Sequence, residues 1–100
     1  MTAEEIEALG YFEPRLLPTG EWAALHRFLF TTGLIVGIDR VGYRTRFCYE
    51  NTFDALNALT QWDGTGDPPG PWIKEKSQGR DRENPNAHTF AGIPIVTAPR

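Results

Sequence analysis

Nine consecutive residues, Asp63 to Pro71, constrain the fold of this chain more than any other stretch. They read D-G-T-G-D-P-P-G-P, with three prolines that lack a backbone N–H donor and three glycines that mark special backbone angles. Such a run is compatible with neither a helix nor the interior of a sheet. We therefore expect an ordered loop over 63–71 that divides the secondary structure before it from the elements after it.

Size and composition predict one globular domain over residues 1–100. Of the 100 residues, 40% are apolar and 12% aromatic, which argues against disorder. The single cysteine excludes an intramolecular disulfide framework and is most easily kept as a thiol in the cytoplasm. The longest apolar-leaning stretch, Trp22 to Ile38, contains His26 and Arg27, and the N-terminus is acidic, so neither a membrane helix nor a secretory signal is expected.

The N-terminal third is predicted to hold two helices. A capping-box pattern, Thr2 with Glu5, starts a short helix that ends at Gly10. After an extended connector over 11–18, a second and central helix is expected to begin at Thr19 and to end near 31–33. Its apolar face is expected to contain Trp22, Leu25 and Leu29 at helical spacing, widened by Phe28 and Phe30.

A β-hairpin and a further helix are expected next. The β-branched run 34–39 and the alternating run 43–49 are predicted to be two antiparallel strands. The helix after them is expected to be capped by Asn51 or Thr52 and to end around Trp62. Its buried stripe is expected to contain Phe53, Leu56 and Leu59.

The C-terminal part is expected to contain short strands and a polar loop. Residues 72–76 are predicted to form a strand, 77–88 a polar loop, and 93–97 an edge strand that Pro94 interrupts. An edge strand can pair with a second copy, so both a monomer and a homodimer stay open. The predicted fold class is α+β, with two N-terminal helices, an antiparallel β-hairpin, one helix and then one or two short strands.

No catalytic constellation is evident in the sequence. His26, His88 and Cys48 are the only histidines and the only thiol, and no carboxylates show ligand spacing for a metal. Asp63 and Asp67 lie in the glycine-rich loop without a calcium-loop pattern, and such residues more often cap turns. We expect no catalytic residue, metal or cofactor, while a small enzyme or metal protein around Cys48 and a histidine stays an alternative.

Charge is distributed in blocks around a formal net charge of −3, which disfavours a general nucleic-acid binder. A local strip could nevertheless bind a nucleic-acid strand through basic and aromatic side chains. The strip would contain Arg44, Arg46, Trp72, Lys74 and Lys76. Acidic residues of the first helix, Glu4, Glu5 and Glu7, could instead meet a basic groove of a partner protein.

Two tryptophans, Trp62 and Trp72, bracket the loop. We favour the interpretation that both indoles seal one end of the domain, because so much aromatic surface is costly to expose to water. The alternative is an ordered binding feature in which Asp63 and Asp67 take part.

The motif W-D-G-x-G-x-P-P-G-P-W-I-K is preceded by F-x-A-L-x-A-L and followed by D-R-x-N-P-N. In this combination, residues 43–86 resemble small uncharacterised bacterial proteins found among phage and prophage genes. The resemblance implies a genetic context and no functional residue. Proteins of that setting are often inhibitors or adaptors of host machinery, including anti-CRISPR proteins.

These features favour a non-catalytic protein-binding module of a phage or mobile element, which acts as an inhibitor or adaptor of a larger host or phage complex. A nucleic-acid-binding module is the second hypothesis, and a small enzyme or metal protein is the third.

Overall fold

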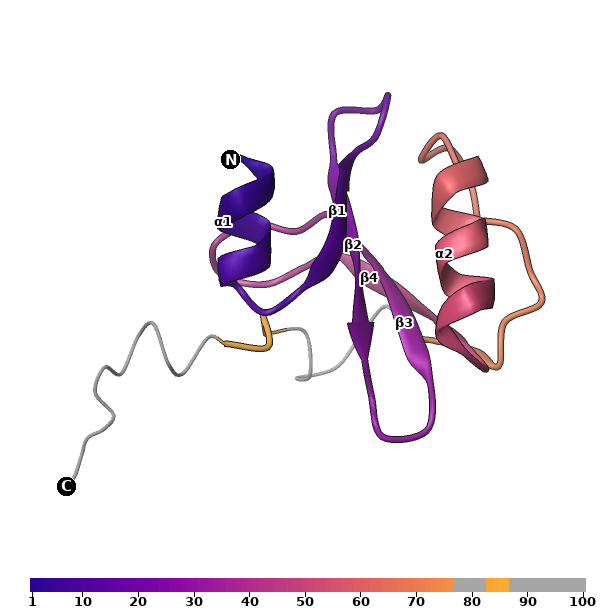
Figure 1. Cartoon of the computed structure of the whole chain (residues 1–100). Coiled ribbons are helices and arrows are strands. Elements are labelled where there is room, and N and C mark those ends of the chain that lie inside the picture. The colour runs from indigo at the N-terminus through magenta and orange to yellow at the C-terminus, as the bar shows by residue number, and fades with distance from the viewer. Residues whose placement is uncertain (77–82, 87–100) are drawn as a thin grey trace, which may run out of the picture.

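An antiparallel five-stranded sheet forms the centre of the protein in the computed structural model, which describes residues 1–76 and 83–86 (Figure 1). The strands lie side by side in chain order, so every strand pairs with its neighbour in the sequence. They are β1 (Phe12–Leu16), β2 (Trp22–Arg27), β3 (Thr32–Val36), β4 (Thr45–Tyr49) and β5 (Lys74–Lys76).

Two helices cover opposite faces of this sheet, α1 (Ala3–Ala8) and α2 (Thr52–Gln61). Figure 1 shows the sheet between them. Side chains of a strand alternate between the faces, so the sheet supports two separate hydrophobic cores. Leu25 and Leu34 pack on the α2 side, whereas Ala24 and Ile35 pack with α1.

The expected helix over 19–33 is wrong, because this segment is strand β2, a turn and the start of β3. Ala23 and Leu25 are fully buried in the core beneath α2, and Ala24 is fully buried in the core beneath α1. A strand buried on both faces loses the polar alternation that distinguishes it from a buried helix. The protein therefore has one N-terminal helix in place of two, and the expected connector 11–18 contains β1.

Other predicted elements are confirmed. The Thr2 hydroxyl accepts from the Glu5 amide, and the Glu5 carboxylate accepts from the Thr2 amide, which completes the capping box of α1. The two expected strands of the hairpin are β3 and β4, which pair in antiparallel register. Asn51 caps α2 by accepting from the Asp54 amide, and Trp62 ends the helix.

The expected buried stripe of α2 is partly wrong. Phe53 is 76% exposed, while Ala55, Ala58 and Leu59 are buried and Leu56 is half-buried. The helix approaches the sheet through its alanines, and this direction turns the first-turn phenylalanine towards solvent. A large apolar side chain is thereby left at the start of α2.

The loop over 63–71 is present as expected and is held at both ends. The Trp62 indole donates to the Thr65 carbonyl at 3.2 Å, and the Tyr49 hydroxyl donates to the Pro69 carbonyl at 2.6 Å. Burial raises the pKa of Tyr49 to about 12, so this hydroxyl keeps its proton at neutral pH. These contacts fix the loop against the end of the sheet.

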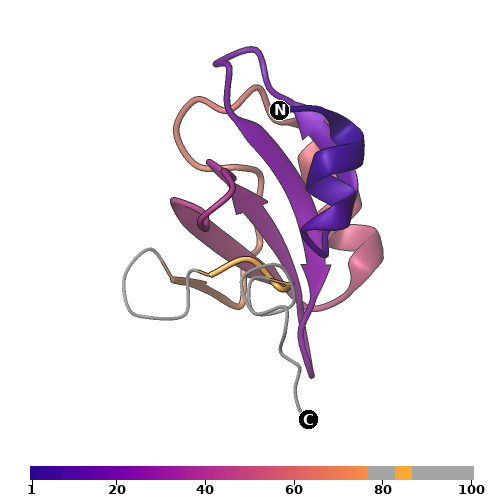
Figure 2. The ribbon, with the colours of Figure 1, turned by 90° about the vertical axis from the view of Figure 1, so that its left-hand side faces the viewer.

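Beyond the loop, the strand expected over 72–76 is the shorter β5. Of the expected polar loop 77–88, the structure describes Glu83 to Asn86, which cross the same sheet face as α1 (Figure 2). Asn84 is buried there, where it accepts from the Tyr11 hydroxyl at 2.6 Å and donates to the Asp39 carbonyl at 2.7 Å. The expected edge strand 93–97 lies outside the described residues.

Candidate interaction surface

The turn between β2 and β3 projects from one end of the molecule (Figure 1). A hydrogen bond of 2.8 Å from the Phe28 amide to the Thr31 carbonyl closes this turn. Its two central residues, Leu29 and Phe30, are 85% and 84% exposed. Large apolar side chains therefore form the most projecting part of the β2–β3 hairpin.

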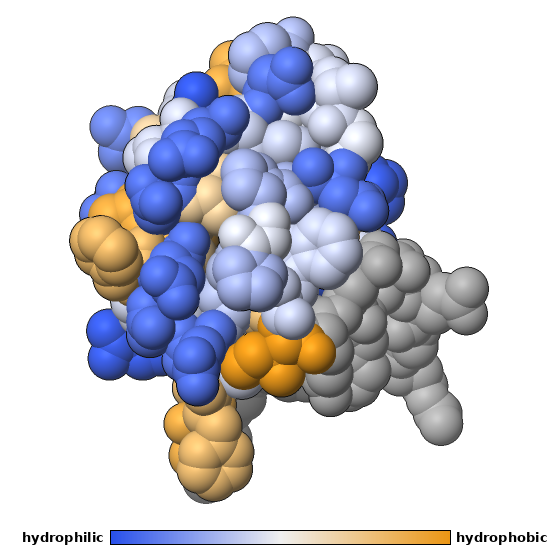
Figure 3. Space-filling model, turned by 90° about the vertical axis from the view of Figure 1, so that its right-hand side faces the viewer, coloured by the Kyte–Doolittle hydropathy of each residue, from blue (hydrophilic) through white to orange (hydrophobic). Residues whose placement is uncertain are grey.

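Phe53 lies at the same end of the molecule. The Thr32 and Thr52 hydroxyls are 2.8 Å apart, which ties the base of the turn to the start of α2. We call the exposed set Leu29, Phe30 and Phe53 the apolar tip. Apolar surface is visible at this lower end in the space-filling view (Figure 3). This surface is not predicted by the sequence pattern, which places the three side chains on buried helix faces.

Behind the apolar tip, rings and a guanidinium form a row across the sheet face that carries α1. His26 packs edge-on against Phe28, with ring centroids 4.8 Å apart, and against Tyr11 on its other side at 6.3 Å. The Arg46 guanidinium carbon lies 4.5 Å from the Phe28 ring centroid, and its Nη1 donates to the Tyr43 hydroxyl at 3.0 Å. We call this set the aromatic row; it links β2 to β4.

The position of His26 in the aromatic row lowers the pKa of its imidazole. Burial lowers the pKa of its imidazole below 6.5, hydrogen bonding to the Gly10 backbone opposes that shift, and the Arg46 charge adds to it. The ring is therefore mostly neutral at pH 7. In this state it packs as an aromatic group between two other rings.

Strand β3 and the Phe28 ring lie between Cys48 and His26, the nucleophile and base of the alternative enzyme hypothesis. Across the sheet, His26 pairs with Gly33, and Gly33 pairs with Cys48, so β3 separates the two residues. The Phe28 ring lies on Gly33 and occupies this space. Cys48 itself is only 3% exposed. The two groups are thus not arranged as nucleophile and base, while His88 lies outside the described residues.

Of the predicted basic strip, the structure describes the side chains of Arg44, Arg46 and Trp72, while those of Lys74 and Lys76 lie outside the described part. Arg44 holds Glu21 through two hydrogen bonds of 2.9 Å, and this contact lowers the pKa of the Glu21 carboxyl and raises that of Arg44. Arg46 is buried to all but 9% of its surface. The backbones of Lys76 and Lys74 pair with those of Arg46 and Cys48.

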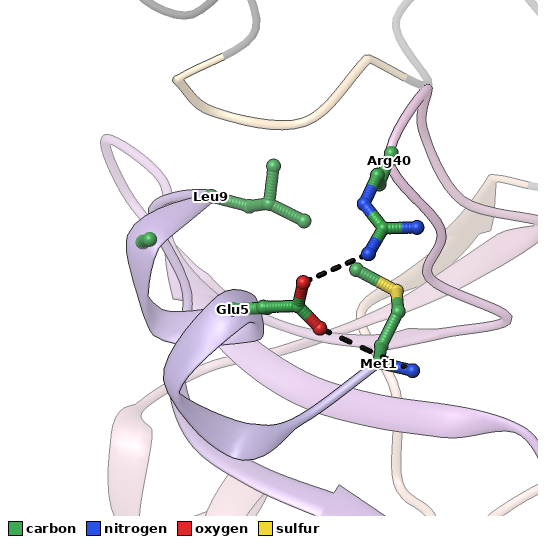
Figure 4. Close-up of a pocket in the computed structure, with 5 residues that line it drawn as sticks. Met1, Glu5, Leu9 and Arg40 are labelled. Atoms are coloured by element: carbon green, nitrogen blue, oxygen red, sulfur yellow. Dashed lines mark hydrogen bonds and ion pairs between the residues drawn. The ribbon is translucent and has the colours of Figure 1, made fainter.

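The acidic residues of α1 divide into two groups. Glu4 and Glu7 are exposed, whereas the Glu5 carboxylate accepts a hydrogen bond of 2.8 Å from Nη2 of Arg40. This hydrogen bond lowers the pKa of the Glu5 carboxyl. The pair borders a pocket of about 240 Å³ between α1 and the β3–β4 connection, which is also lined by Met1, Ala8 and Leu9 (Figure 4).

The favoured interpretation of the tryptophans is confirmed. Trp62 is 4% exposed and belongs to the core beneath α2, and Trp72 packs against that core. Both indoles contact Phe47, with ring centroids 6.2 and 5.2 Å away. Asp63 caps a turn by accepting from the Thr65 amide at 2.8 Å, and Asp67 is exposed on the loop.

Within residues 1–76 and 83–86, no group of three or more His, Cys, Asp or Glu side chains is placed to hold a metal ion. Neither of the two described helices is long and apolar enough to cross a membrane.

Comparison with known proteins gives no relative: no family model, no curated protein and no solved structure matches the chain. The resemblance of residues 43–86 to phage-associated proteins therefore stays a prediction.

Proposed function

We propose that this protein is a non-catalytic binding module of a phage or mobile element, which attaches to a larger protein complex as an inhibitor or adaptor. The exposure of Leu29 and Phe30 on a projecting turn carries this proposal. Single exposed apolar residues are common, but a cluster on a protruding element is typical of interaction sites. Phe53 at the base extends the cluster to a second element.

The charge arrangement supports a protein partner over a nucleic acid. The charge of Arg44 is compensated by its ion pair with Glu21. Binding of a phosphate backbone depends on several accessible cations, and its strength falls steeply with salt. A net charge of −3 adds a general repulsion towards nucleic acid.

Binding through the apolar tip can be tested by affinity capture from a lysate of the bacterium that carries the gene. The double variant Leu29→Ser with Phe30→Ser is expected to weaken binding of the stoichiometric partner at least about 100-fold, because each side chain contributes about 1.5–3 kcal/mol when buried. The matched control is Gln61→Ser, an exposed position at the other end of α2.

Three results would contradict the proposal. The first is equal partner capture by the double variant and the wild type. The second is oligonucleotide binding with a steep salt dependence in the absence of a protein partner. The third is a homodimer in sedimentation experiments that dissociates when the tip is changed, because the tip would then bind a second copy of this chain.

A further inference from the structure

Arg46 is a buried cation with incomplete partners. It is 9% exposed, Nη1 is bound to the Tyr43 hydroxyl, and Nε is buried without a hydrogen-bond acceptor. Among the residues whose side chains the structure describes, 1–73 and 83–86, no carboxylate oxygen lies within 4.0 Å of its guanidinium. Arg44, two residues earlier, instead holds Glu21 with both Nε and Nη2.

Such an arrangement is unfavourable without an anion. Removing a guanidinium from water is compensated chiefly by a carboxylate or another anion, whereas a hydroxyl and a ring face compensate only part of the cost. The Nε side of a guanidinium, together with one terminal nitrogen, is also the edge that binds a carboxylate with two parallel hydrogen bonds. In Arg46 the Tyr43 hydroxyl occupies Nη1, whereas Nε, on the edge that it shares with Nη2, is buried without an acceptor.

The position of Arg46 indicates where that anion comes from. Its guanidinium lies on Phe28, which directly precedes Leu29 and Phe30 in the same turn. We propose that Arg46 receives a carboxylate of the partner protein, from an acidic residue next to the apolar segment that binds the tip. This inference rests on the proposed function and adds the chemistry of the partner surface, which is an apolar pocket with an acidic rim.

A carboxylate fits this surface better than the phosphates of a nucleic acid. The proposed site offers one guanidinium, and the exposed Glu4 and Glu7 project from the helix that covers the same sheet face. A polyanion would meet these charges over its length, whereas a single acidic side chain would not.

His26 provides a direct reporter of an anion at Arg46. The Arg46 charge contributes to the lowered pKa of this imidazole, so neutralising that charge must raise the pKa. The Tyr11 and Phe28 rings and the Gly10 backbone, which also face the imidazole, carry no charge at neutral pH. Proton NMR of the imidazole therefore reads the occupancy of Arg46 without knowledge of the natural partner.

The test is a titration of the purified protein with acetate at constant ionic strength, with the His26 resonance assigned through His26→Gln. We expect a saturable shift and a raised His26 pKa, both absent in Arg46→Gln and retained in the matched control Arg44→Gln. Arg46→Lys keeps the charge but loses the two-pronged donor, so it should bind acetate about fivefold more weakly. This variant also keeps the test valid if Arg46→Gln fails to fold.

Inorganic phosphate at the same ionic strength is the second arm. Saturable binding of phosphate and not of acetate would overturn the assignment to a carboxylate and indicate a phosphate-bearing ligand. No saturable response to either anion, or an identical response in Arg46→Gln, would overturn the anion site itself. Because this titration leaves the apolar tip unchanged and uses no partner, its failure is distinguishable from failure of the proposed function.

Discussion

The Phe28 ring lies directly on Gly33, and a Cβ at position 33 would be 2.6 Å from the Phe28 Cε2 atom. A larger residue near the start of β3 would therefore have to displace this ring, so glycine fits here although its usual effect in a strand is to weaken it. The vacant space lets the ring fold back from the turn and contact His26 and Arg46. Because position 33 has no side chain, Phe28, which directly precedes the apolar tip, can pack within the aromatic row.

Gly33→Ala should displace the Phe28 ring and destabilise the protein. Inserting a methyl group into a packed site costs about 1–3 kcal/mol, to be measured as the free energy of unfolding in denaturant. In a Phe28→Ala background the same change should cost much less, because the clashing ring is gone. Equal costs in the two backgrounds would show that Phe28 does not pack on Gly33 in solution.

The stability of the protein should decline in acid in two stages. The folded state lowers the pKa of His26 below 6.5, so the unfolded chain binds more protons, and stability present above pH 6.5 is lost as the pH falls below it. The lowered pKa of Glu21 adds a second loss below pH 4.5. Unfolding midpoints across this range should show the first stage vanish in His26→Gln, and its persistence there would assign it to another group.

Arg15, on strand β1, should stabilise the C-terminal end of helix α2. Its Nη1 donates to the Leu59 carbonyl in the last turn of the helix, where the helix dipole also interacts favourably with a cation. Arg15→Gln should lower the free energy of unfolding by about 1 kcal/mol and speed amide hydrogen exchange in the last turn. Arg27→Gln, at an exposed position, is the control and should change stability by less than about 0.5 kcal/mol.

Tyr49→Phe should loosen the loop 63–71 without unfolding the sheet. The change removes the hydrogen bond to the Pro69 carbonyl and keeps the buried ring, so we expect a loss of about 1 kcal/mol. Limited proteolysis should cleave the variant faster within the loop. Cleavage at the wild-type rate would mean that the core contacts of Trp62 and Trp72 suffice to hold the loop.

Part of this fold follows from local sequence signals. The Thr2–Glu5 capping box, the Asn51 cap and the proline-rich loop each depend on neighbours within a few residues, and each prediction is confirmed. The alternation over 43–49 also survives in β4, since Phe47 and Tyr49 share the core beneath α2.

The rest depends on contacts distant in the chain. Strand β2 has helices over both faces, so its sequence carries no alternation that would separate a strand from a helix. A helix over 19–33 would bury Leu29 and Phe30, which in the strand and turn are exposed and support the proposed function. Nothing near Arg46 in the sequence indicates that Phe28 would cover it, because this contact is set by the register of three strands.

Photo-crosslinking from position 30 can show whether the apolar tip contacts a partner protein. Phe30 replaced by p-benzoylphenylalanine should give one stoichiometric protein adduct in a lysate of the source organism, and the same residue placed at exposed position 61 should give none. The adduct from position 30 should disappear when Leu29→Ser and Phe53→Ser are added. No adduct from position 30, or the same adducts from both positions, would contradict binding through the apolar tip.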